Sequence, residues 1–565
     1  MKHDMSNSVY TADATRTAPS GRLGIGLLSS VLGLLGLLCG LFTLVHPSNG
    51  VIVFTSLAYG IITAILIWYG SRSVYDPRPV AAPAPSLVIA IATILALLIA
   101  FVVLEAFPNS ADEFGYTYLA DTLRHHRLWN ASFPGNLHDV LMTVYLPDHD
   151  GKRVSQYPPG WPTILALLPS LRLSAIANPI LGLLSAVFLL LSFKELRIPG
   201  RLNAALLVLA LLAPFTLFNN SSFYNHTLAG TCLIAIVYLD LRQHRVRSFW
   251  NQLGIGVAFS ILLTNRYEVF MLAFITYALD GLVRRRGEFI KASMITALGA
   301  LPITLLFGYY NWKITGSPLT TTLAWGAPNI SYGLHATGMD GPNTPAKALE
   351  HTGRYVMGWS EFASVAILPF YVAALWRRVA SRTIRWYDAM LPAIVLFFVF
   401  YPDGGGFQYG PRYWFAGWVL LPLTLATGFA DGGPWIFGRW SIDPVRLALL
   451  QGASYIGFTV GFAIFAHIQV DVRRAPLLAA ARAPEPAVVL FAEYPVRYVP
   501  WQIETVTLQP VDYTRNGADG LGPVILARNL GPERTALLCK QISGRTIWRL
   551  DYTGSPPVAR LKPAC

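Results

Sequence analysis

The sequence predicts an α-helical polytopic membrane protein with about 13 transmembrane helices and a small extracytoplasmic domain towards its C-terminal end. Of its 565 residues, 54% are hydrophobic and 13% are charged, whereas a soluble protein of this size carries about twice that charged fraction. The apolar residues gather in long runs, namely Leu23–Val45, Val51–Tyr69, Leu87–Phe107, Ser174–Phe193, Leu202–Phe218, Leu228–Leu241, Phe249–Leu263, Val269–Val283, Ser293–Tyr310, Phe362–Trp376, Trp386–Tyr401, Tyr413–Ala430 and Val445–Ile468. The net charge of +13 is attributed to topology and to contact with anionic lipid, so it does not predict nucleic-acid binding.

The charges of the connecting loops predict the orientation of the chain in the membrane. Four loops are rich in arginine and lysine, namely residues 194–201, 242–247, 284–291 and 377–385. Such loops stay on the cytoplasmic side, which places the N-terminus inside and the C-terminus outside. This scheme requires residues 159–193 to cross only once. We therefore expect the short segment Pro159–Leu171 to form a half-helix or an interfacial helix.

These patterns divide the chain into three regions. They are residues 1–80, with a cytoplasmic N-terminus and an apolar hairpin at Leu23–Tyr69; residues 81–470, with the other apolar runs and long outer loops at 108–158 and 311–361; and residues 471–565, with a soluble composition. In the last region, Val488–Leu490 and Thr505–Leu508 are typical of β-strands. We therefore expect a small α+β or mostly β domain there.

The chain has four cysteines. Cys539 and Cys565 lie in the C-terminal region, where an oxidising compartment would allow a disulfide, and two free thiols are the alternative. Cys39 and Cys232 lie inside apolar runs and are interpreted as packing residues. The spacing of the cysteines is not that of a zinc or redox motif.

Two adjacent carboxylates, Asp112 and Glu113, follow an apolar run that ends at Phe107. Ionisable residues at a membrane edge are costly to place for packing alone, so they are functional candidates. We interpret them as part of an active site at the boundary between lipid and water, with a carboxylate available as a general base. The alternative is structural, because aspartate is also a common N-cap for a helix that would begin at Phe114.

Three further motifs lie in loops that this topology places on the same outer side. They are Tyr157-Pro-Pro-Gly-Trp-Pro162, Tyr310-Asn-Trp-Lys-Ile-Thr-Gly-Ser-Pro318 and Gly404-Gly-Gly-Phe-Gln-Tyr-Gly-Pro-Arg-Tyr413. Together with Asp112 and Glu113, and in this order, they resemble the GT-C superfamily of membrane glycosyltransferases. The closest group contains the protein O-mannosyltransferases and the lipid A aminoarabinose transferase. The hairpin Leu23–Tyr69 and the C-terminal region depart from the better-known members.

The resemblance implies a sugar donor carried on polyprenyl phosphate and an inverting transfer to an acceptor hydroxyl of a glycan, a lipid or a protein. It also implies a bacterial inner membrane protein whose active site faces the periplasm. By resemblance, Asp112 is the general base, and Glu113 is expected to orient a neighbour or the acceptor. Members of the superfamily differ in whether they use a divalent cation such as Mg²⁺ or Mn²⁺, and the carboxylates of this chain do not decide between the two.

A phosphate leaving group requires nearby cations, and aromatic rings suit a sugar or a polyprenyl chain. The candidate phosphate ligands are Lys152, Arg153, Arg266 and Arg412, of which Lys152 and Arg412 are favoured. The other candidate contacts are Tyr157, Tyr409, Tyr413 and His226. Each also has a structural alternative: a turn for the first two cations, an interfacial anchor for Arg412, helix ends for Arg266 and His226, and a helix start or aromatic belt for the tyrosines.

Other functions remain as alternatives. Asp139, Asp148 and Asp150 are interpreted as solvated loop acids, with a metal or second-carboxylate role as the alternative. The protein could be a transporter or flippase for a lipid-linked sugar, or an assembly protein that works through its C-terminal region. Transporters tend to place charges at the bilayer midplane. The unusual charges of this chain lie near one face, which favours the enzyme.

Overall fold

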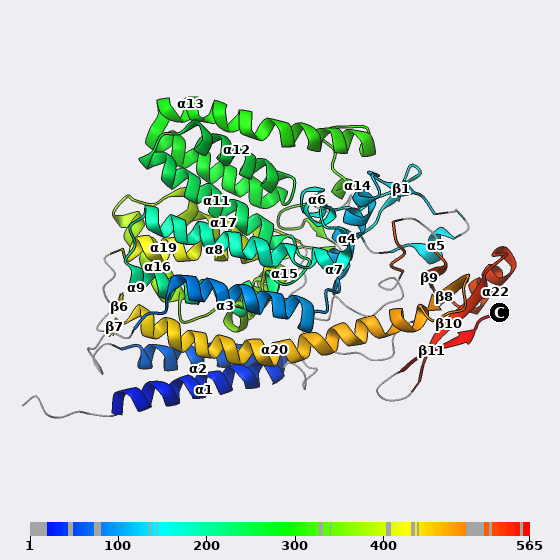
Figure 1. Cartoon of the computed structure of the whole chain (residues 1–565), viewed down its shortest axis with the longest axis horizontal. Helices are drawn as coiled ribbons and strands as arrows, with labels where there is room; N and C mark the ends of the chain where they lie inside the picture. Colours follow the sequence, from blue (N-terminus) through cyan, green and yellow to red (C-terminus); the bar gives the residue numbers. More distant parts are fainter. Residues whose placement is uncertain are drawn as a thin grey trace, which may run out of the picture.

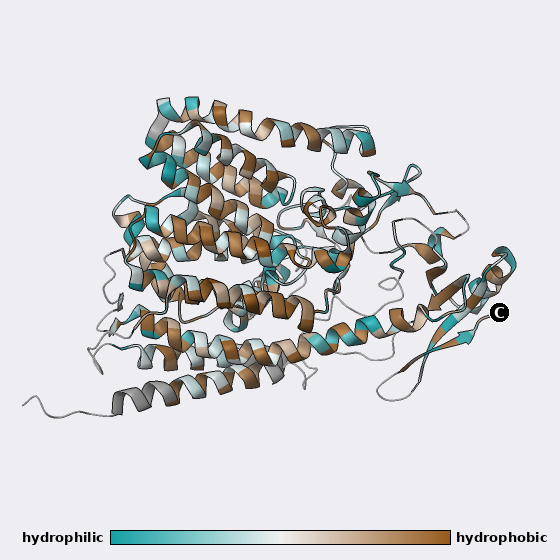
Figure 2. Ribbon diagram, viewed as in Figure 1, coloured by the Kyte–Doolittle hydropathy of each residue, from teal (hydrophilic) through white to brown (hydrophobic). Residues whose placement is uncertain are grey.

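Long helices, lying roughly side by side, form the main body of the protein, and a small sheet lies beyond one end of them (Figure 1). The computed structural model describes residues 20–42, 49–72, 81–133, 135, 137–143, 145–326, 331–338, 341–402, 408–430, 435–437, 440–492, 514–518, 522–553 and 558–565. Hydrophobic residues make up most of the helices, and hydrophilic residues are more frequent at the helix ends and in the sheet region (Figure 2).

Helices occupy most of the described part of every apolar run predicted from the sequence. The main helices are α1 (Ser20–Phe42), α2 (Asn49–Gly70), α3 (Pro85–Leu98) with its π-helical continuation η2 (Ile99–Val103), α8 (Ala177–Glu195), α9 (Gly200–Leu211), α11 (His226–Arg245), α12 (Phe249–Leu263), α13 (Tyr267–Thr315), α16 (Leu368–Ala380), α17 (Trp386–Val399), α19 (Leu421–Gly428) and α20 (Pro444–Ala480). Among the described residues, four helices are long and apolar enough to cross a membrane: Pro85–Val103, Leu171–Glu195, Gly287–Thr315 and Pro444–Ala480. The count of about 13 crossings stays a prediction.

The long helix α13 folds back on itself. The rings of Tyr267 and Phe307 lie 6.0 Å apart, and those of Tyr277 and Phe289 lie 5.9 Å apart. In a straight helix, the first pair would be separated by roughly 60 Å, at 1.5 Å per residue. The chain therefore turns near Arg284, and α13 supplies two antiparallel legs. These legs correspond to two of the predicted apolar runs, with the arginine cluster at the turn.

Two other predicted runs are interrupted. Leu202–Phe218 is divided between α9 and α10 (Pro214–Asn219), and Tyr413–Ala430 is divided between α18 (Phe415–Trp418) and α19. Both α10 and α19 have a proline in their first turn. Proline lacks the backbone N–H that a continuing helix needs, but it fits the first turn of a new one. Pro159–Leu171 was expected to be a half-helix, and its only helix before Leu171, α6 (Gly160–Ala166), has seven residues.

The four basic loops meet at one end of the bundle. Arg245 Nε lies 2.8 Å from Glu195 Oε2, and Arg247 Nη2 lies 2.9 Å from Glu288 Oε1. Arg385 joins α17 to two other helices, because its guanidinium lies 3.1 Å from Asp240 and 3.0 Å from Asp280. The loops therefore share one side, as the charge pattern predicts, while their cytoplasmic location stays a prediction.

The two long outer loops contain short elements of their own. The first holds α4 (Ala111–Arg124), β1 (Asn130–Ala131), α5 (His138–Leu141), β2 (Asp148–His149) and β3 (Lys152–Arg153), and its strands pair in the order β1-β3-β2. The second holds α14 (Leu323–Gly326), β4 (Thr337–Gly338), β5 (Gly341–Pro342) and most of α15 (Pro345–Phe362). The amphipathic helix α15 packs against α2 and α17.

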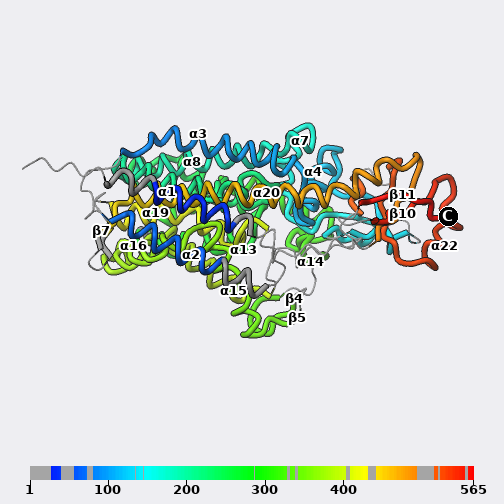
Figure 3. Tube along the Cα trace, turned by 90° about the horizontal axis from the view of Figure 1, so that it is seen from below, coloured from blue at the N-terminus to red at the C-terminus, as the bar shows by residue number. Residues whose placement is uncertain are grey.

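Helix α20 leads out of the bundle to the C-terminal sheet (Figures 1 and 3). It continues through Asp471 to Ala480. The sheet contains β8 (Ala487–Phe491), β9 (Val524–Arg528), β10 (Thr546–Thr553) and β11 (Val558–Pro563) in the order β11-β10-β8-β9. The predicted strand Val488–Leu490 is confirmed as part of β8, and Thr505–Leu508 lies outside the described residues.

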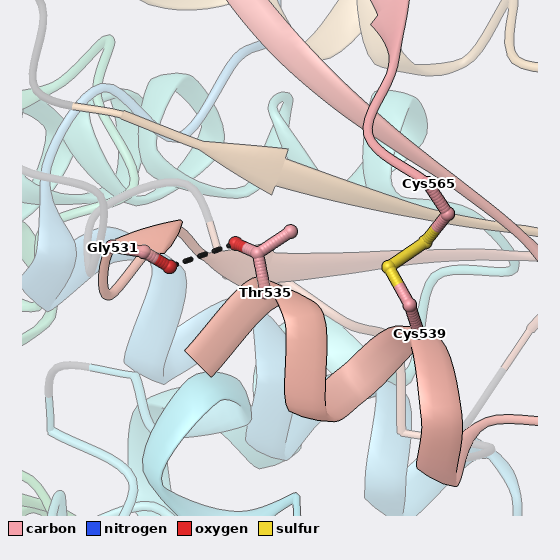
Figure 4. The surroundings of a disulfide bond; sticks show 4 residues. All are labelled: Gly531, Thr535, Cys539 and Cys565. Carbon is pink, nitrogen blue, oxygen red and sulfur yellow. Dashed lines mark hydrogen bonds between the residues drawn. A yellow bond between two sulfur atoms is a disulfide. The ribbon is translucent and has the colours of Figure 1, made fainter. Parts of the chain in front are cut away.

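Both faces of this sheet are covered. Successive side chains of a strand point to opposite faces. Val488 and Leu490 pack with α5 of the first outer loop and with α22 (Pro532–Gln541), whereas Val489 and Phe491 pack against the end of α20. Cys539 of α22 forms a disulfide with Cys565, so the structure has the disulfide and not the alternative of two free thiols (Figure 4). Cys39 and Cys232 are buried free thiols.

A close crossing of α1 and α20 predicts a sensitive site. A β-carbon on Gly457 would lie 1.9 Å from the carbonyl oxygen of Gly33, so only glycine permits this approach. We expect Gly457→Ala to lower the free energy of unfolding by about 1–3 kcal/mol through overpacking. Thermal unfolding of detergent-purified protein measures the effect. In the control Gly452→Ala the new carbon would lie 3.4 Å from Val208, so an equal loss in both variants would contradict the prediction.

Candidate active site

The first outer helix, α4, begins with a cap that fixes both predicted acids. Ser110 is the N-cap, its Oγ accepts a hydrogen bond from the Glu113 backbone N–H at 3.1 Å, and its hydroxyl lies 3.0 Å from Glu113 Oε2. Asp112 and Glu113 therefore lie in the first helical turn, where the helix dipole favours negative charge. The alternative in which they cap a helix starting at Phe114 is wrong, because α4 begins at Ala111.

Asp112 lies against two partners from distant parts of the chain. Arg412 Nη1 is 2.7 Å from Asp112 Oδ2, and the Tyr157 hydroxyl donates a hydrogen bond to Asp112 Oδ1. The Asp112 side chain is 18% exposed and that of Arg412 is 7% exposed. The carboxylate is therefore the accessible member of the pair, and both of its oxygens are engaged.

Arg412 is enclosed by aromatic rings. Its guanidinium carbon lies 4.4 Å from the ring centroid of Tyr224 and 5.6 Å from that of Tyr413. Burial alone would lower the pKa of Arg412, but Asp112 and the nearby tyrosines raise it, and the net pKa lies well above its ordinary value. Within the described part of the chain, Arg412 Nε has no hydrogen-bond partner. Arg412 thus stays charged and keeps a donor for a further anion.

A second buried arginine lies next to this pair. Arg266 Nε donates to Glu268 Oε1 at 2.6 Å, and the Arg266 guanidinium also contacts His226. Its guanidinium carbon lies 5.4 Å from the ring centroid of Tyr413. Tyr413 is therefore a shared neighbour of both arginines. Four of the predicted residues, Arg266, Arg412, Tyr413 and His226, come together here, although they belong to three separate loops.

Glu113 connects α4 to the loop before α11. Glu113 Oε1 accepts a hydrogen bond from the Phe223 backbone N–H at 2.8 Å, and Trp161 Nε1 donates to the Phe223 carbonyl at 2.7 Å. Burial raises the pKa of Glu113 to about 7, against the lowering effect of its hydrogen bonds from Phe223 and Ser110. The Glu113 side chain is therefore buried and bound to backbone, and its orienting role stays a prediction.

The predicted tyrosines divide into two groups. Tyr157 contacts Asp112 and packs on Tyr116 with ring centroids 4.4 Å apart. Tyr409 is 1% exposed and stacks on Phe218 with centroids 5.8 Å apart, which makes it a packing residue in this structure.

The structure gives Lys152 and Arg153 other partners. Lys152 Nζ donates to the carbonyls of Lys313 and Ile314 at 3.0 and 2.8 Å, near the end of α13. Arg153 is 2% exposed, and its guanidinium carbon lies 3.8 Å from the ring centroid of Phe133. Lys152 thus makes a helix C-terminal contact and Arg153 a stacking contact, and their role as phosphate ligands stays a prediction.

Tyr224 and Gln408 belong to the site but were not predicted from the sequence. The Tyr224 hydroxyl donates to Gln408 Oε1 at 3.1 Å, and Gln408 Nε2 donates to the Asn109 carbonyl at 3.1 Å. The available signal was position alone, because Tyr224 precedes the predicted His226 by two residues and Gln408 lies inside the Gly404–Tyr413 motif.

The acids of the first outer loop have separate partners. Asp139 forms an ion pair with Arg534 at 2.7 Å, Asp148 accepts from the Phe133 backbone N–H at 3.1 Å, and Asp150 lies 3.1 Å from His149. Their ligand atoms do not form a metal cluster with Asp112 among the described residues. One cluster of suitable atoms, Glu105, His467 and Asp471, lies where α3–η2 meets α20, and Arg474 pairs with its glutamate.

Comparisons with known proteins identify the fold. No protein-family model and no curated protein matches the sequence. The structure of ArnT from Cupriavidus metallidurans bound to undecaprenyl phosphate matches with a TM-score of 0.50 and 12% identity, over 83% of this chain and 92% of that chain. ArnT is a membrane glycosyltransferase of the GT-C superfamily. The chain has the GT-C fold.

Two further solved structures are similar. ArnT from the same organism in the apo state has a TM-score of 0.46 and 12% identity, over 74% of this chain and 84% of that chain. The archaeal oligosaccharyltransferase AglB from Archaeoglobus fulgidus, in complex with an inhibitory peptide and a dolichol-phosphate, has a TM-score of 0.46 and 11% identity, over 82% of this chain and 69% of that chain.

The buried Glu113 predicts a pH-dependent stability of the protein. An ordinary glutamate titrates near 4.5 and Glu113 near 7, so between these values the folded protein keeps a proton that the unfolded chain releases. The contribution of this proton to stability is complete below pH 4.5 and is lost as the pH rises through 7. At about 1.4 kcal/mol per pKa unit, the loss is about 3 kcal/mol.

Glu113→Gln should remove this dependence, because the amide keeps an oxygen for the Phe223 N–H and does not titrate. Thermal unfolding of purified protein between pH 5 and 8 measures the slope. Glu350→Gln, at an exposed site on α15, is the matched control. If wild type and Glu113→Gln have the same slope, Glu113 is not the titrating group.

Proposed function

We propose that the protein is an integral-membrane glycosyltransferase that moves a sugar from a polyprenyl-phosphate donor to an acceptor hydroxyl, with inversion at the anomeric carbon. The observation that carries this proposal is the contact between Asp112 and Arg412, a partly exposed carboxylate against a buried arginine. The GT-C fold supports it, as does the undecaprenyl phosphate bound to ArnT. A base and a phosphate-binding cation within one contact distance are the two groups that such a transfer needs.

The proposed reaction is a direct displacement. The acceptor oxygen forms a bond to the anomeric carbon while the bond from that carbon to the phosphate oxygen breaks, and the acceptor proton passes to Asp112. Arg412 stabilises the negative charge that develops on the leaving phosphate. Attack from the side opposite the phosphate inverts the anomeric centre. Arg266 and Arg412 both lie near the Tyr413 ring, so Arg266 brings a second guanidinium to the same region.

The pairing of Asp112 has a consequence for the order of events. Both Asp112 oxygens are engaged, one by Arg412 and one by Tyr157. Each oxygen has a second lone pair and could accept a hydrogen bond from an acceptor hydroxyl beside its present partner. A donor phosphate competes with Asp112 for Arg412, so donor binding would leave one oxygen with more room for the acceptor hydroxyl. The proposed mechanism therefore favours binding of the donor before the acceptor.

The proposed setting is a bacterial inner membrane, with the site on the periplasmic side and the basic loops in the cytoplasm. The gathering of the basic loops at the end away from Asp112 supports this orientation (Figure 1). The acceptor is a glycan, a lipid or a protein. Where a divalent cation takes part, Asp112 is the accessible carboxylate that could contact it beside the phosphate.

Asp112→Asn tests the base. Asparagine keeps the size and a hydrogen-bonding oxygen but cannot accept the proton, so we expect transfer to fall by about 10²–10⁴-fold. The assay measures radiolabelled sugar transferred from native membrane lipids at equal expression. Asp121→Asn, on the exposed face of the same helix, is the control and should retain activity. Full transfer by Asp112→Asn would exclude this mechanism, and a transporter for the same lipid would tolerate the change.

Arg412→Gln tests the phosphate contact. Removing one such donor costs about 10²–10³-fold in kcat, and the KM for the lipid donor should also rise because ground-state phosphate binding is lost. Arg412→Lys should recover part of the activity, since lysine keeps the charge but not the planar stacking. Arg354→Gln, which removes an arginine from α15 on the same outer side, is the control. An unchanged KM and kcat in Arg412→Gln would place the phosphate elsewhere.

A further inference from the structure

The segment just before α4 is held mainly by the C-terminal region. Arg515 Nη1 donates a hydrogen bond to the Pro108 carbonyl at 2.7 Å. Arg473, near the end of α20, donates to the Asn109 carbonyl, which Gln408 Nε2 also contacts at 3.1 Å. Two of these three donors therefore come from beyond residue 470. The carbonyls that they hold immediately precede Ser110, the N-cap of the helix that carries Asp112.

Arg515 also packs between the two ends of this segment. Its guanidinium carbon lies 5.5 Å from the ring centroid of Phe107 and 5.4 Å from that of Phe114. A guanidinium combines stacking on rings with directional N–H donation, which an ammonium does less well. Phe107 ends the preceding apolar run, and Phe114 follows Asp112 by two residues. A single side chain thus contacts both sides of the turn that leads into α4.

Neighbours of Arg515 attach it to the sheet and to the first outer loop. Asn516 forms two hydrogen bonds with the backbone of Leu526 in β9, both at 2.9 Å. On its other side, Thr514 Oγ1 donates to the Met142 carbonyl at 2.9 Å. Ala518 is buried with Tyr118 of α4 and Leu146. Residues 514–518 therefore connect the C-terminal sheet to the catalytic helix by hydrogen bonds and by packing.

We propose that Arg515 is a positioning residue of the active site, through which the C-terminal region fixes the backbone before α4 and with it the direction of Asp112. The proposal rests on the proposed function, since it assigns Arg515 a role through Asp112. Arg515 contacts the backbone at Pro108 and the ring of Phe114, whereas Asp112 itself contacts Arg412 and Tyr157. Small displacements of a reacting group can reduce a rate by about a hundredfold, so support at this distance affects the rate.

A second contact between the same regions provides a matched control. Arg534 of α22 donates to both carboxylate oxygens of Asp139 at 2.7 and 2.8 Å. This ion pair also joins the C-terminal region to the first outer loop, but it lies on α5 rather than at the start of α4. Removing it weakens docking without removing a contact to the Pro108–Phe114 segment. A comparison of substitutions at Arg515 and Arg534 therefore distinguishes a loss of α4 positioning from a general loss of attachment between the C-terminal region and the first outer loop.

The experiment compares Arg515→Ala, Arg515→Lys and Arg534→Ala in the full chain. For Arg515→Ala, we expect kcat to fall by roughly tenfold to a hundredfold with the KM for the lipid donor within about twofold. Arg515→Lys should recover part of kcat, because its ammonium can still reach a carbonyl. Arg534→Ala should keep its kcat. The melting temperatures of Arg515→Ala and Arg534→Ala should be similar, which excludes unfolding as the cause.

Hydrogen–deuterium exchange of the peptide covering Pro108–Arg124 gives a readout that needs no activity. Arg515→Ala should exchange faster than wild type at the start of α4, and Arg534→Ala should not. Equal kcat in Arg515→Ala and wild type, or equal losses in the alanine variants, would overturn the proposal. If wild type transfers no sugar, the proposed function fails, and the exchange comparison still decides whether Arg515 holds α4. Equal exchange in the alanine variants would overturn that role.

Discussion

A charge at the edge of an apolar helix bundle is stable only where an opposite charge, a dipole or a polarisable ring lies against it, and the outer end of this protein is organised by that constraint. Asp112 lies against Arg412, and Arg412 lies against Tyr224 and Tyr413. These residues belong to three loops that are far apart in the chain. Each loop therefore supplies a charge or an aromatic ring that stabilises a residue of another loop, and the site can form only when all three loops lie together.

The same constraint acts at the opposite end with a different outcome. Arg385 lies between Asp240 and Asp280, and the basic loops connect to one another through further ion pairs. These pairs join helix ends to one another, and the Arg247–Glu288 pair among them is largely exposed. Between the two polar ends, helix contact depends on shape, as where Gly457 meets Gly33. Ion pairs between loops at both ends of the bundle, and close apolar packing between those ends, together specify the arrangement of the helices.

The features that could be predicted from the sequence depend on whole segments or on local motifs, whereas the features that could not be predicted depend on contacts between distant residues. Apolar runs predict helices because burial in a membrane acts on a whole segment, and a proline such as Pro214 marks where a run is interrupted. Arg412 and Asp112 could be predicted because each lies in a recognisable motif. Lys152 and Arg153 could not be placed, because adjacent residues of a strand point to opposite sides and the sequence does not show what each side meets. Arg515 gave no local signal, since its contacts depend on how a distant segment folds back.

The distance along the chain between Asp112 and Arg412 has a consequence for biosynthesis. Asp112 leaves the ribosome long before the loop that carries Arg412, and many apolar helices are inserted in between. Throughout that interval the carboxylate lacks the guanidinium that it contacts in the folded protein, so water or lipid headgroups must solvate it. The nascent protein therefore passes through a stage in which the site has its acid but not its guanidinium, and the contact between them can form only after synthesis reaches the Gly404–Tyr413 loop.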